Sequence, residues 1–527
     1  MTGQPSGFLT RLGRHLPEWP TGLAGRGLML RHLSNLLALP LAGDFLALGH
    51  SLALWRWQLL PWDRQTIDTV SALAKMVGQP ALPAWTAEKA RTEEHFVPAI
   101  QAIAEGRAEA AAELWMKHGA AAGNASWLGE TGLFFLQNGD EARARMVLET
   151  TTLAGNHPVR LLLQAFLAYC YASPESAITA IRDLPEDFRW IRSLLEAQCL
   201  LRQGGTDGAG VLLKLWREIP WHPNLTLKLH DLLAPVAAPA PPEADTAVLI
   251  YSWNNADLLE KTLQSLAQSE LGAASVLILD NGSADHTQAV VHASANLFGE
   301  RLKSFRLPVN IGAPAARNWL LRHPEASRFR RLVFMDDDVL LPPGWLCELT
   351  SHARRTPRGA IVGCRIMDQA PRRSVQMADV NLLAPDPDGE FLIANAGGGE
   401  LDLGLHDYNR PCLSVTGCCH MMDRERAMEL GGFDLRFNPS QFDDFELDLR
   451  NALAGGHAFY AGRTAIRHCQ RSSLNQADSE AKQGHIQGNL LKLNAKYTPE
   501  QKDELLRINR QLLWADLLAR TRDLENL

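Results

Sequence analysis

The chain has 527 residues, of which 46% are hydrophobic and 21% charged, a composition typical of soluble globular proteins. At this length we expect two or three domains rather than a single core. The net charge of -7 at pH 7 offers no basic footprint for nucleic acid, which speaks against a nucleic-acid-binding protein. The eight cysteines are scattered without a CxxC pair, which fits reduced thiols and a cytoplasmic location.

The N-terminal segment predicts neither a signal peptide nor a membrane-spanning helix. Leu33 to Trp55 is its most hydrophobic stretch, but Pro40, Asp44 and His50 interrupt it. A spanning helix needs about 20 largely uncharged residues, so we expect a buried helix pair here. The basic, Leu- and Trp-rich composition of the first 60 residues leaves peripheral contact with the inner face of a membrane open.

Residues 1–233 show helical periodicity and a repeat. A turn followed by a helix with small residues recurs, starting at Gly106, Gly139, Ser173 and Gly205. Ala111, Ala144 and Ala177 in the first three copies are 33 residues apart, close to the period of about 34 residues in helix-turn-helix solenoids. The copies resemble degenerate tetratricopeptide-like repeats, and a non-repetitive helical domain is the alternative. Because solenoids often present a concave surface, we expect this region to bind a protein or polymer partner or to be a structural extension.

A proline-rich segment at 234–244 predicts a linker, because proline at this density stops helices and favours an extended chain. The pattern then changes to strands alternating with helices. We expect strands over Ala247 to Tyr251, Ser275 to Leu279 and Arg331 to Phe334. This alternation predicts a mostly parallel α/β sheet, in which ligands bind at the carboxyl ends of the strands.

Polar motifs occur at those strand ends. Asp336, Asp337 and Asp338 directly follow the last apolar run, and adjacent carboxylates repel one another unless a cation or solvent compensates them. Their oxygens suit a divalent ion such as Mg²⁺ or Mn²⁺, and an acidic turn facing water is the alternative. Asp280 ends the second strand, where its carboxylate can accept an N–H from a nucleobase. Arg317 lies in the first turns of a helix, where an anion is favoured.

These elements, in this order, resemble the family-2 glycosyltransferases of the GT-A fold, which is Rossmann-like with a mostly parallel sheet. The resemblance covers about residues 245 to 475. The matching motifs are Tyr251-Ser252-Trp253-Asn254, Asp280-Asn281-Gly282-Ser283, Asn310-x-Gly312 with Ala316-Arg317-Asn318, Asp336-Asp337-Asp338, Gly431-Gly432-Phe433-Asp434, Asp443-Asp444-Phe445-Glu446, and His468 with Ser472.

The resemblance implies an inverting, metal-dependent transferase that moves a sugar from a nucleoside diphosphate, UDP by default, to a hydroxyl of a saccharide, lipid-linked or protein acceptor. It implies that Asp336, Asp338 and His468 bind Mn²⁺ or Mg²⁺. Asp444 takes the place of the catalytic base, although Asp443 stands where relatives carry glutamate, so which of the two acts stays open. The nucleotide-sugar contacts it implies come from Ser252, Asn254, Asp280, Asn310, Arg317, Asp336 and Asp337.

Ordinary structural roles are the alternatives to these assignments. Asp443 and Asp444 could simply be acidic residues in the first turn of a helix, where they favour the helix dipole. His468 could be an ordinary hydrogen-bonded core residue. Cys418, Cys419 and His420 invite a zinc hypothesis, but neighbouring cysteines without a spaced second pair are a poor zinc pattern.

We therefore expect four segments: a helical repeat domain at 1–233, the linker at 234–244, a glycosyltransferase domain at 245–475 and a helical extension at 476–527. An apolar stripe in the extension, including Leu505 and Leu517, predicts docking on one of the domains or on a partner chain. Two other functions remain as alternatives. One is a helical scaffold whose glycosyltransferase-like domain only binds nucleotide sugar. The other is a nucleotidyl- or phosphotransferase.

Overall fold

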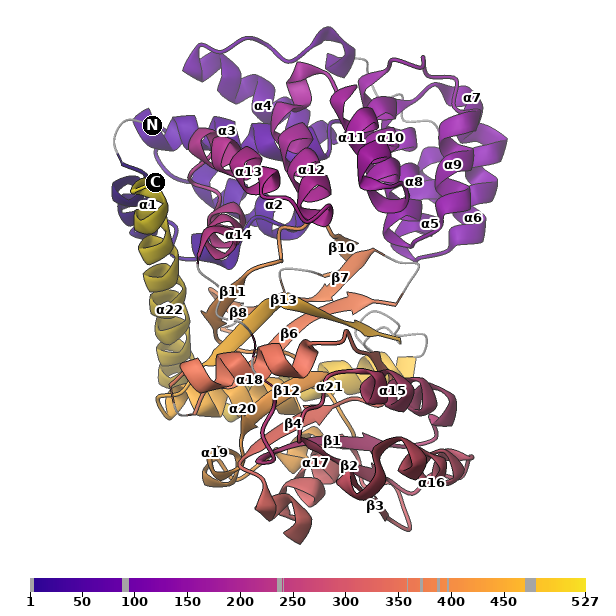
Figure 1. Cartoon of the computed structure of the whole chain (residues 1–527). Coiled ribbons are helices and arrows are strands. Elements are labelled where there is room, and N and C mark those ends of the chain that lie inside the picture. Colours follow the sequence, from indigo (N-terminus) through magenta and orange to yellow (C-terminus); the bar gives the residue numbers. More distant parts are fainter. Residues whose placement is uncertain are drawn as a thin grey trace.

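The computed structural model describes residues 4–87, 94–234, 239, 241–357, 359–369, 373–385, 389–395, 398–469 and 480–527. Within its described part up to residue 234 the elements are helices, and the first strand begins at Thr246. The fold class expected from the sequence is confirmed, because an all-helical region precedes an α/β domain (Figure 1). Ser472 and five residues of the proline-rich segment, 235–238 and 240, lie outside the described residues.

The helices of the N-terminal region pack in consecutive pairs. Ala111, Ala144 and Ala177 lie on α6, α9 and α11 and are each 1% exposed, so the repeat seen in the sequence falls on buried helix contacts. In the fourth copy Gly208 is buried, and a Cβ there would lie 2.7 Å from the Ala197 carbonyl oxygen. The helices are α1 (Pro5–Gly13), α2 (Arg26–Leu37), α3 (Gly43–Leu59), α4 (Arg64–Val77), α5 (Phe96–Ala104), α6 (Ala108–Leu114), α7 (Ala120–Ala122), α8 (Ala125–Gln137), α9 (Glu141–Thr150), α10 (Pro158–Tyr171), α11 (Pro174–Arg182), α12 (Arg189–Arg202), α13 (Asp207–Glu218) and α14 (Pro223–Leu233).

The apolar stretch from Leu33 to Trp55 forms the end of α2 and most of α3, with Pro40 in the connection between them. Leu36, Leu48, Leu52 and Trp55 are fully buried, as expected for a helix pair inside a protein. Among the described residues, no helix combines the length and hydrophobicity that crossing a bilayer would require.

The main sheet of the α/β domain has the strand order β10-β7-β6-β12-β4-β1-β2-β3, with β13 beside β6, β5 and β11. β1, β2, β3 and β4 pair in parallel, whereas β12 runs antiparallel to both β4 and β6. β13 is parallel to β6. The strands are β1 (Thr246–Ser252), β2 (Ser275–Asp280), β3 (Leu302–Arg306), β4 (Arg331–Met335), β5 (Val339–Leu340), β6 (Ile361–Asp368), β7 (Ser374–Met377), β8 (Val380–Leu383), β9 (Leu392–Asn395), β10 (Glu400–Leu401), β11 (Asn409–Cys412), β12 (Cys419–Asp423) and β13 (Ala458–His468).

Helices cover both faces of this sheet. Alternate residues of β1 face opposite sides, as the two-residue period of a strand requires: Val248 and Ile250 pack on one side, Ala247 and Leu249 on the other. The first core includes residues of α15, α16 and α18, and the second includes residues of α17, α19 and α20. The remaining helices are α15 (Ala256–Gln268), α16 (Thr287–Phe298), α17 (Ala313–Arg322), α18 (Trp345–Arg355), α19 (Arg424–Glu429), α20 (Asp443–Leu453), α21 (Glu480–Lys496) and α22 (Pro499–Glu525).

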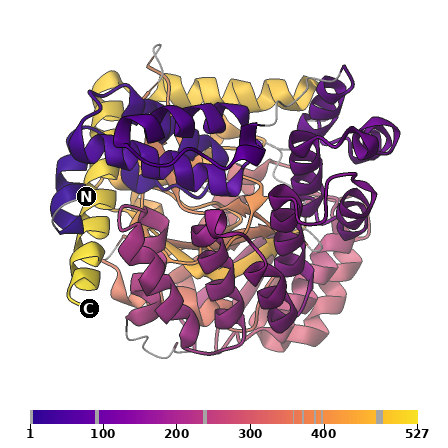
Figure 2. The ribbon, with the colours of Figure 1, turned by 90° about the horizontal axis from the view of Figure 1, so that it is seen from above.

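The last helix, α22, connects the helical region to the α/β domain and runs along both (Figure 1). Leu505 joins a cluster with α20 and α21, while Leu517 belongs to the core of the N-terminal helices. Trp514 Nε1 donates to the Pro17 carbonyl at 2.8 Å, and Arg520 Nη2 donates to the Asn409 carbonyl at 2.6 Å. The apolar stripe in the C-terminal segment therefore docks within this chain, on both regions. Seen from above, the N-terminal helices follow a curved path over the strands (Figure 2).

Candidate active site

The carboxyl ends of several strands form one edge of the sheet because these strands run in the same direction. β1, β2, β4, β6 and β13 all run the same way, so Ser252, Asp280 and His468 lie at strand ends on this edge, and Asp336 follows β4 directly. The antiparallel strand β12 starts here, with Cys419 opposite Met335. The Asp336 backbone N–H donates to the Cys418 carbonyl at 3.2 Å, which brings Cys418 to the same point.

Asp336, Asp338 and His468 form the centre of this edge. His468 Nε2 lies 2.9 Å from Asp338 Oδ1 and 3.9 Å from Asp336 Oδ2. On the other side of the ring, Nδ1 is 2.8 Å from Gln376 Oε1. Since that amide oxygen can only accept, Nδ1 carries the proton and Nε2 faces the carboxylates. Burial alone would lower the pKa of His468, but the hydrogen bond and charge of Asp338 outweigh burial and raise it.

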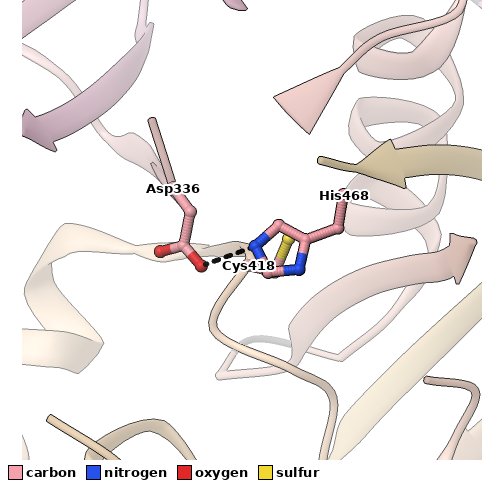
Figure 3. Close-up of side chains that lie close together, drawn as sticks. All are labelled: Asp336, Cys418 and His468. Atoms are coloured by element: carbon pink, nitrogen blue, oxygen red, sulfur yellow. Dashed lines mark ion pairs between the residues drawn. The ribbon is translucent and has the colours of Figure 1, made fainter. Parts of the chain in front are cut away.

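This centre has ligand atoms for a divalent cation. One atom each from Asp336, Cys418 and His468 lie within 4.8 Å of one another (Figure 3). Burial raises the pKa of Asp336 to about 6, even though Arg317 and His468 oppose that shift. A divalent ion would stabilise the charged form of these buried carboxylates. It would also bind the imidazole nitrogen that faces them. The residues therefore fit a bound cation.

Asp337 turns away from this centre and fixes the loop after β1. Its carboxylate accepts hydrogen bonds from Ser252 Oγ and, at 3.0 Å, from Asn255 Nδ2. Thr262 Oγ1 donates to the Asp337 carbonyl at 2.9 Å and accepts from the Val339 N–H at 3.0 Å, so Thr262 fixes the turn of the acidic triplet. Burial, followed by the neighbouring charge of Asp338, raises the pKa of Asp337 to about 7.

Arg317 joins the acidic triplet to the second carboxylate pair. Its Nη1 donates to Asp443 Oδ2 at 2.6 Å, and its Nη2 donates to Asp336 Oδ1 at 3.2 Å and to the Gly417 carbonyl at 3.4 Å. The residue is only 5% exposed and lies over the rings of Tyr251 and Phe433, with centroid distances of 5.4 and 5.5 Å. One guanidinium group thus spans from Asp336 to Asp443.

Asp443 and Asp444 begin α20 but have different surroundings. Asp443 is 2% exposed and held by Arg317, and burial raises its pKa against the effect of that arginine. Asp444 is half-buried and accepts hydrogen bonds from the backbone N–H of Gly417 and, at 2.8 Å, from its neighbour Phe445. Asp444 is therefore the more accessible carboxylate of the two.

The predicted nucleotide-side residues form a connected set of hydrogen bonds. Asp280 Oδ1 accepts from the Ser283 N–H at 2.8 Å, and its other oxygen lies 3.3 Å from Arg306 Nε. Ser283 Oγ accepts from the Asn254 N–H at 3.0 Å. Asn310 is exposed, and its side-chain oxygen accepts from the Gly312 N–H at 2.8 Å. These residues border one loop cluster beside β1 and β2.

Several residues that shape the site were not identified from the sequence. Gln376 orients His468, and Thr262 fixes the acidic turn. Thr262 had a signal, because it is a polar residue on the otherwise apolar face of α15 that carries Leu259, Leu263 and Leu266. Gln376 had none, since it comes from the short strand β7, far from any motif.

Comparison with known proteins identifies the part of the chain that carries Arg317 and the acidic triplet. Residues 247–430 match the model of glycosyl transferase family 2. This part of the chain is a family-2 glycosyltransferase domain. The resemblance inferred from the motifs is thereby confirmed for the domain.

One curated relative is the O-antigen biosynthesis protein RfbC of Myxococcus xanthus, with 30% identity over 237 residues. The alignment covers 44% of this chain and only 18% of that protein. Among solved structures, the mannosyltransferase PcManGT of Pyrobaculum calidifontis in complex with GDP-Man and Mn²⁺ is similar over 64% of this chain and 85% of that one, with 17% identity and a TM-score of 0.37. The S. aureus TarS 1-349 in complex with UDP-GlcNAc is similar over 50% and 70%, with 15% identity and a TM-score of 0.34. These structural similarities are weak, and the domain assignment rests on the family match.

Proposed function

We propose that this chain is an inverting, metal-dependent glycosyltransferase that moves a sugar from a nucleoside diphosphate to an acceptor hydroxyl. The observation that carries the proposal is the single guanidinium group of Arg317, which contacts Asp336 on one side and Asp443 on the other. The carboxylate proposed to bind metal and the two carboxylates that are candidates for the general base therefore border one site. Asp336 lies within residues 247–430, which match glycosyl transferase family 2, and Asp443 and Asp444 follow that stretch. Sugar transfer requires both, because a diphosphate must leave with its charge and a hydroxyl must lose its proton.

Asp336, Asp338 and His468 would hold the divalent ion, Mn²⁺ or Mg²⁺. When bound there, such an ion supplies Lewis-acid stabilisation of the departing diphosphate. Gln376 supports this role, because its hydrogen bond keeps the proton of His468 on Nδ1 and leaves Nε2 facing the carboxylates.

Asp444 would accept the proton of the attacking hydroxyl. Asp443 is less suited, because Arg317 occupies one of its oxygens at 2.6 Å and the residue is 2% exposed. Asp444 is more accessible, and the backbone N–H of Gly417 fixes its carboxylate. One carboxylate base without a covalent nucleophile implies a single displacement with inversion at the anomeric carbon.

On the donor side, Asp280 would contact the base, while Ser252, Asn254, Asn310 and Asp337 would shape the nucleotide loop. Arg317 would act chiefly by neutralising Asp336 and Asp443, since both of its Nη groups already contact carboxylates. UDP is the default nucleotide.

For the acceptor we propose a saccharide, a lipid-linked saccharide or a protein, recruited by tetratricopeptide-like repeats in the N-terminal helices. The buried small residues Ala111, Ala144 and Ala177 support the repeat interpretation. A cytoplasmic location, with peripheral contact at a membrane, is part of the same proposal.

The alternative is a scaffold whose glycosyltransferase domain only binds nucleotide sugar. Binding and hydrolysis of a panel of nucleotide sugars, measured with Mn²⁺, Mg²⁺ or EDTA, separate the two. We expect Asp338→Ala to lose metal-dependent donor binding, and Asp444→Asn to keep donor binding while turnover falls by about 10²- to 10⁴-fold. Asp503→Asn, at an exposed position of α22, is the matched control and should leave both unchanged. Donor binding that no substitution affects, without turnover of any donor, would favour the scaffold.

A further inference from the structure

The metal-binding centre contains a thiol that the acidic motif does not account for. The Sγ of Cys418 belongs to the group of ligand atoms within 4.8 Å that also includes one oxygen of Asp336 and one nitrogen of His468 (Figure 3). The thiol is buried, with the residue 5% exposed, and Cys418 is held in place by the hydrogen bond from the Asp336 N–H to its carbonyl. Its position follows from the antiparallel start of β12 rather than from any motif.

The neighbours of Cys418 in the sequence do not share this role. His420 packs on the opposite side of the sheet, where its Nε2 lies 2.9 Å from Asp448 Oδ1 in a fully buried pair. Cys419 lies in the core beside Cys364. The zinc pattern considered from the sequence, with Cys418, Cys419 and His420 together, therefore does not form. Cys418 instead meets two residues that are 82 and 50 positions away.

We propose that Cys418 is a metal ligand, so that Asp336, Cys418 and His468 bind a thiophilic divalent ion such as Zn²⁺ or Co²⁺ more tightly than Mg²⁺. This inference deepens the proposed function and rests on it, because it concerns the ion of the same site. Thiolate and imidazole ligands favour Zn²⁺ and Co²⁺, whereas Mg²⁺ prefers oxygen. Bonds of about 2.0–2.3 Å to one tetrahedral ion place ligand atoms about 3.5 Å apart, so the group would have to close by no more than about 1.3 Å.

Binding releases protons and involves no change of oxidation state. The S–H bond of Cys418 breaks, its proton passes to solvent, and the sulfur lone pair forms the bond to the ion. His468 keeps its Nδ1 proton on Gln376, while the proton of the hydrogen bond between Nε2 and Asp338 Oδ1, 2.9 Å apart, also passes to solvent when Nε2 binds the ion. The thiolate then adds a negative charge to those of Asp336 and Asp338 around the divalent ion, and Arg317, 3.2 Å from Asp336, offsets one of them.

Cobalt titration of the full chain tests this ligand directly. Co²⁺ bound through a thiolate gives a sulfur-to-metal charge-transfer band in the near ultraviolet, and we expect this band at one equivalent of Co²⁺. Cys418→Ser should abolish the band and weaken Zn²⁺ binding by at least about tenfold, the lower limit for losing even a supporting residue of a metal site. Cys469→Ser is the matched control, because it removes the half-buried thiol next to His468 and should keep the band.

Each outcome bears on the proposal. Stoichiometric Co²⁺ binding by the wild-type chain without the band would overturn it and leave the transferase proposal intact, and this result needs no variant that might misfold. No Co²⁺ binding, with or without UDP, would also overturn it. If the band appears but donor binding depends neither on metal nor on Asp338, as measured with Asp338→Ala, the thiolate site is upheld and the proposed metal-dependent function is refuted.

Discussion

Gly417→Ala is expected to reduce sugar transfer strongly while leaving donor binding nearly intact. A Cβ on Gly417 would lie 2.8 Å from Asp444 Oδ2, 2.9 Å from Asp444 Cβ and 3.0 Å from Arg317 Nη2. Unstrained contacts between such atoms are longer than 3.4 Å, so the carboxylate would have to move by about half an ångström or more. Displacing a catalytic group by about 1 Å can cost about 100-fold in rate, and we expect a fall of roughly 10- to 100-fold in kcat.

Overpacking at this position should also cost about 1–3 kcal/mol of unfolding free energy. The assay is kcat with saturating donor, together with the donor Kd and a urea unfolding curve. Gly344→Ala is the control, because a Cβ there meets no heavy atom of a neighbour within 4 Å. A folded Gly417→Ala variant with kcat within twofold of wild type would refute the placement of Asp444 as the base.

Three further predictions concern the supports of the site. Gln376→Leu should weaken metal binding by about 10- to 100-fold without unfolding the chain, because it removes the partner that orients His468; isothermal titration with Mn²⁺ checks this. Lys496→Met should cost about 3 kcal/mol at pH 7, since Lys496 pairs with Asp434 at 2.6 Å and with the fully buried Glu446. Partial burial would raise the pKa of Asp434, but hydrogen bonds from Arg436 and Lys496 outweigh it and hold that pKa below its usual range. This stabilisation is therefore present above about pH 4 and is lost as the pH falls, so urea curves of wild type and variant should converge in acid. Leu517→Ala should cost about 2–5 kcal/mol, because Leu517 is 1% exposed in the core of the N-terminal helices; unchanged urea stability would show that α22 is not docked there in solution.

The parts of the fold that were predictable carry a local signal. The strand expected over Ala247 to Tyr251 is β1, Thr246–Ser252, because a run of buried apolar residues between a proline-rich segment and a polar turn has few other solutions. Helices of the N-terminal region were predictable from their period and from small residues such as Ala144. The short strands β7 to β10 were not predicted, since each has at most four residues and none shows a clear alternation.

The candidate site was predictable only where a motif named it. Asp336 and His468 came from motifs, and the parallel strand ends explain why they meet. Their contact with Cys418 could not be predicted, because it depends on β12 being antiparallel to β4 and on Cys419 lying opposite Met335. The alternation of strands and helices predicts the parallel strands, but the reversed direction of β12 is set by long-range packing.

The two regions of the chain are expected to act as one unit, since they share buried polar contacts as well as apolar ones. Arg410 is fully buried in the α/β domain, yet its Nη1 donates to the Pro20 carbonyl at 2.7 Å and its Nη2 to the Leu513 carbonyl at 3.4 Å. Lys228 of α14 is also buried and pairs with Asp407 at 3.0 Å. Removing the helical region would take the Pro20 carbonyl from the buried Arg410 and the lysine partner from Asp407, and an unsatisfied buried donor costs about 1–3 kcal/mol. An acceptor held by the N-terminal helices would therefore be presented to Asp444 at a fixed position rather than on a flexible tether, and the transfer reaction has to be measured on the full chain.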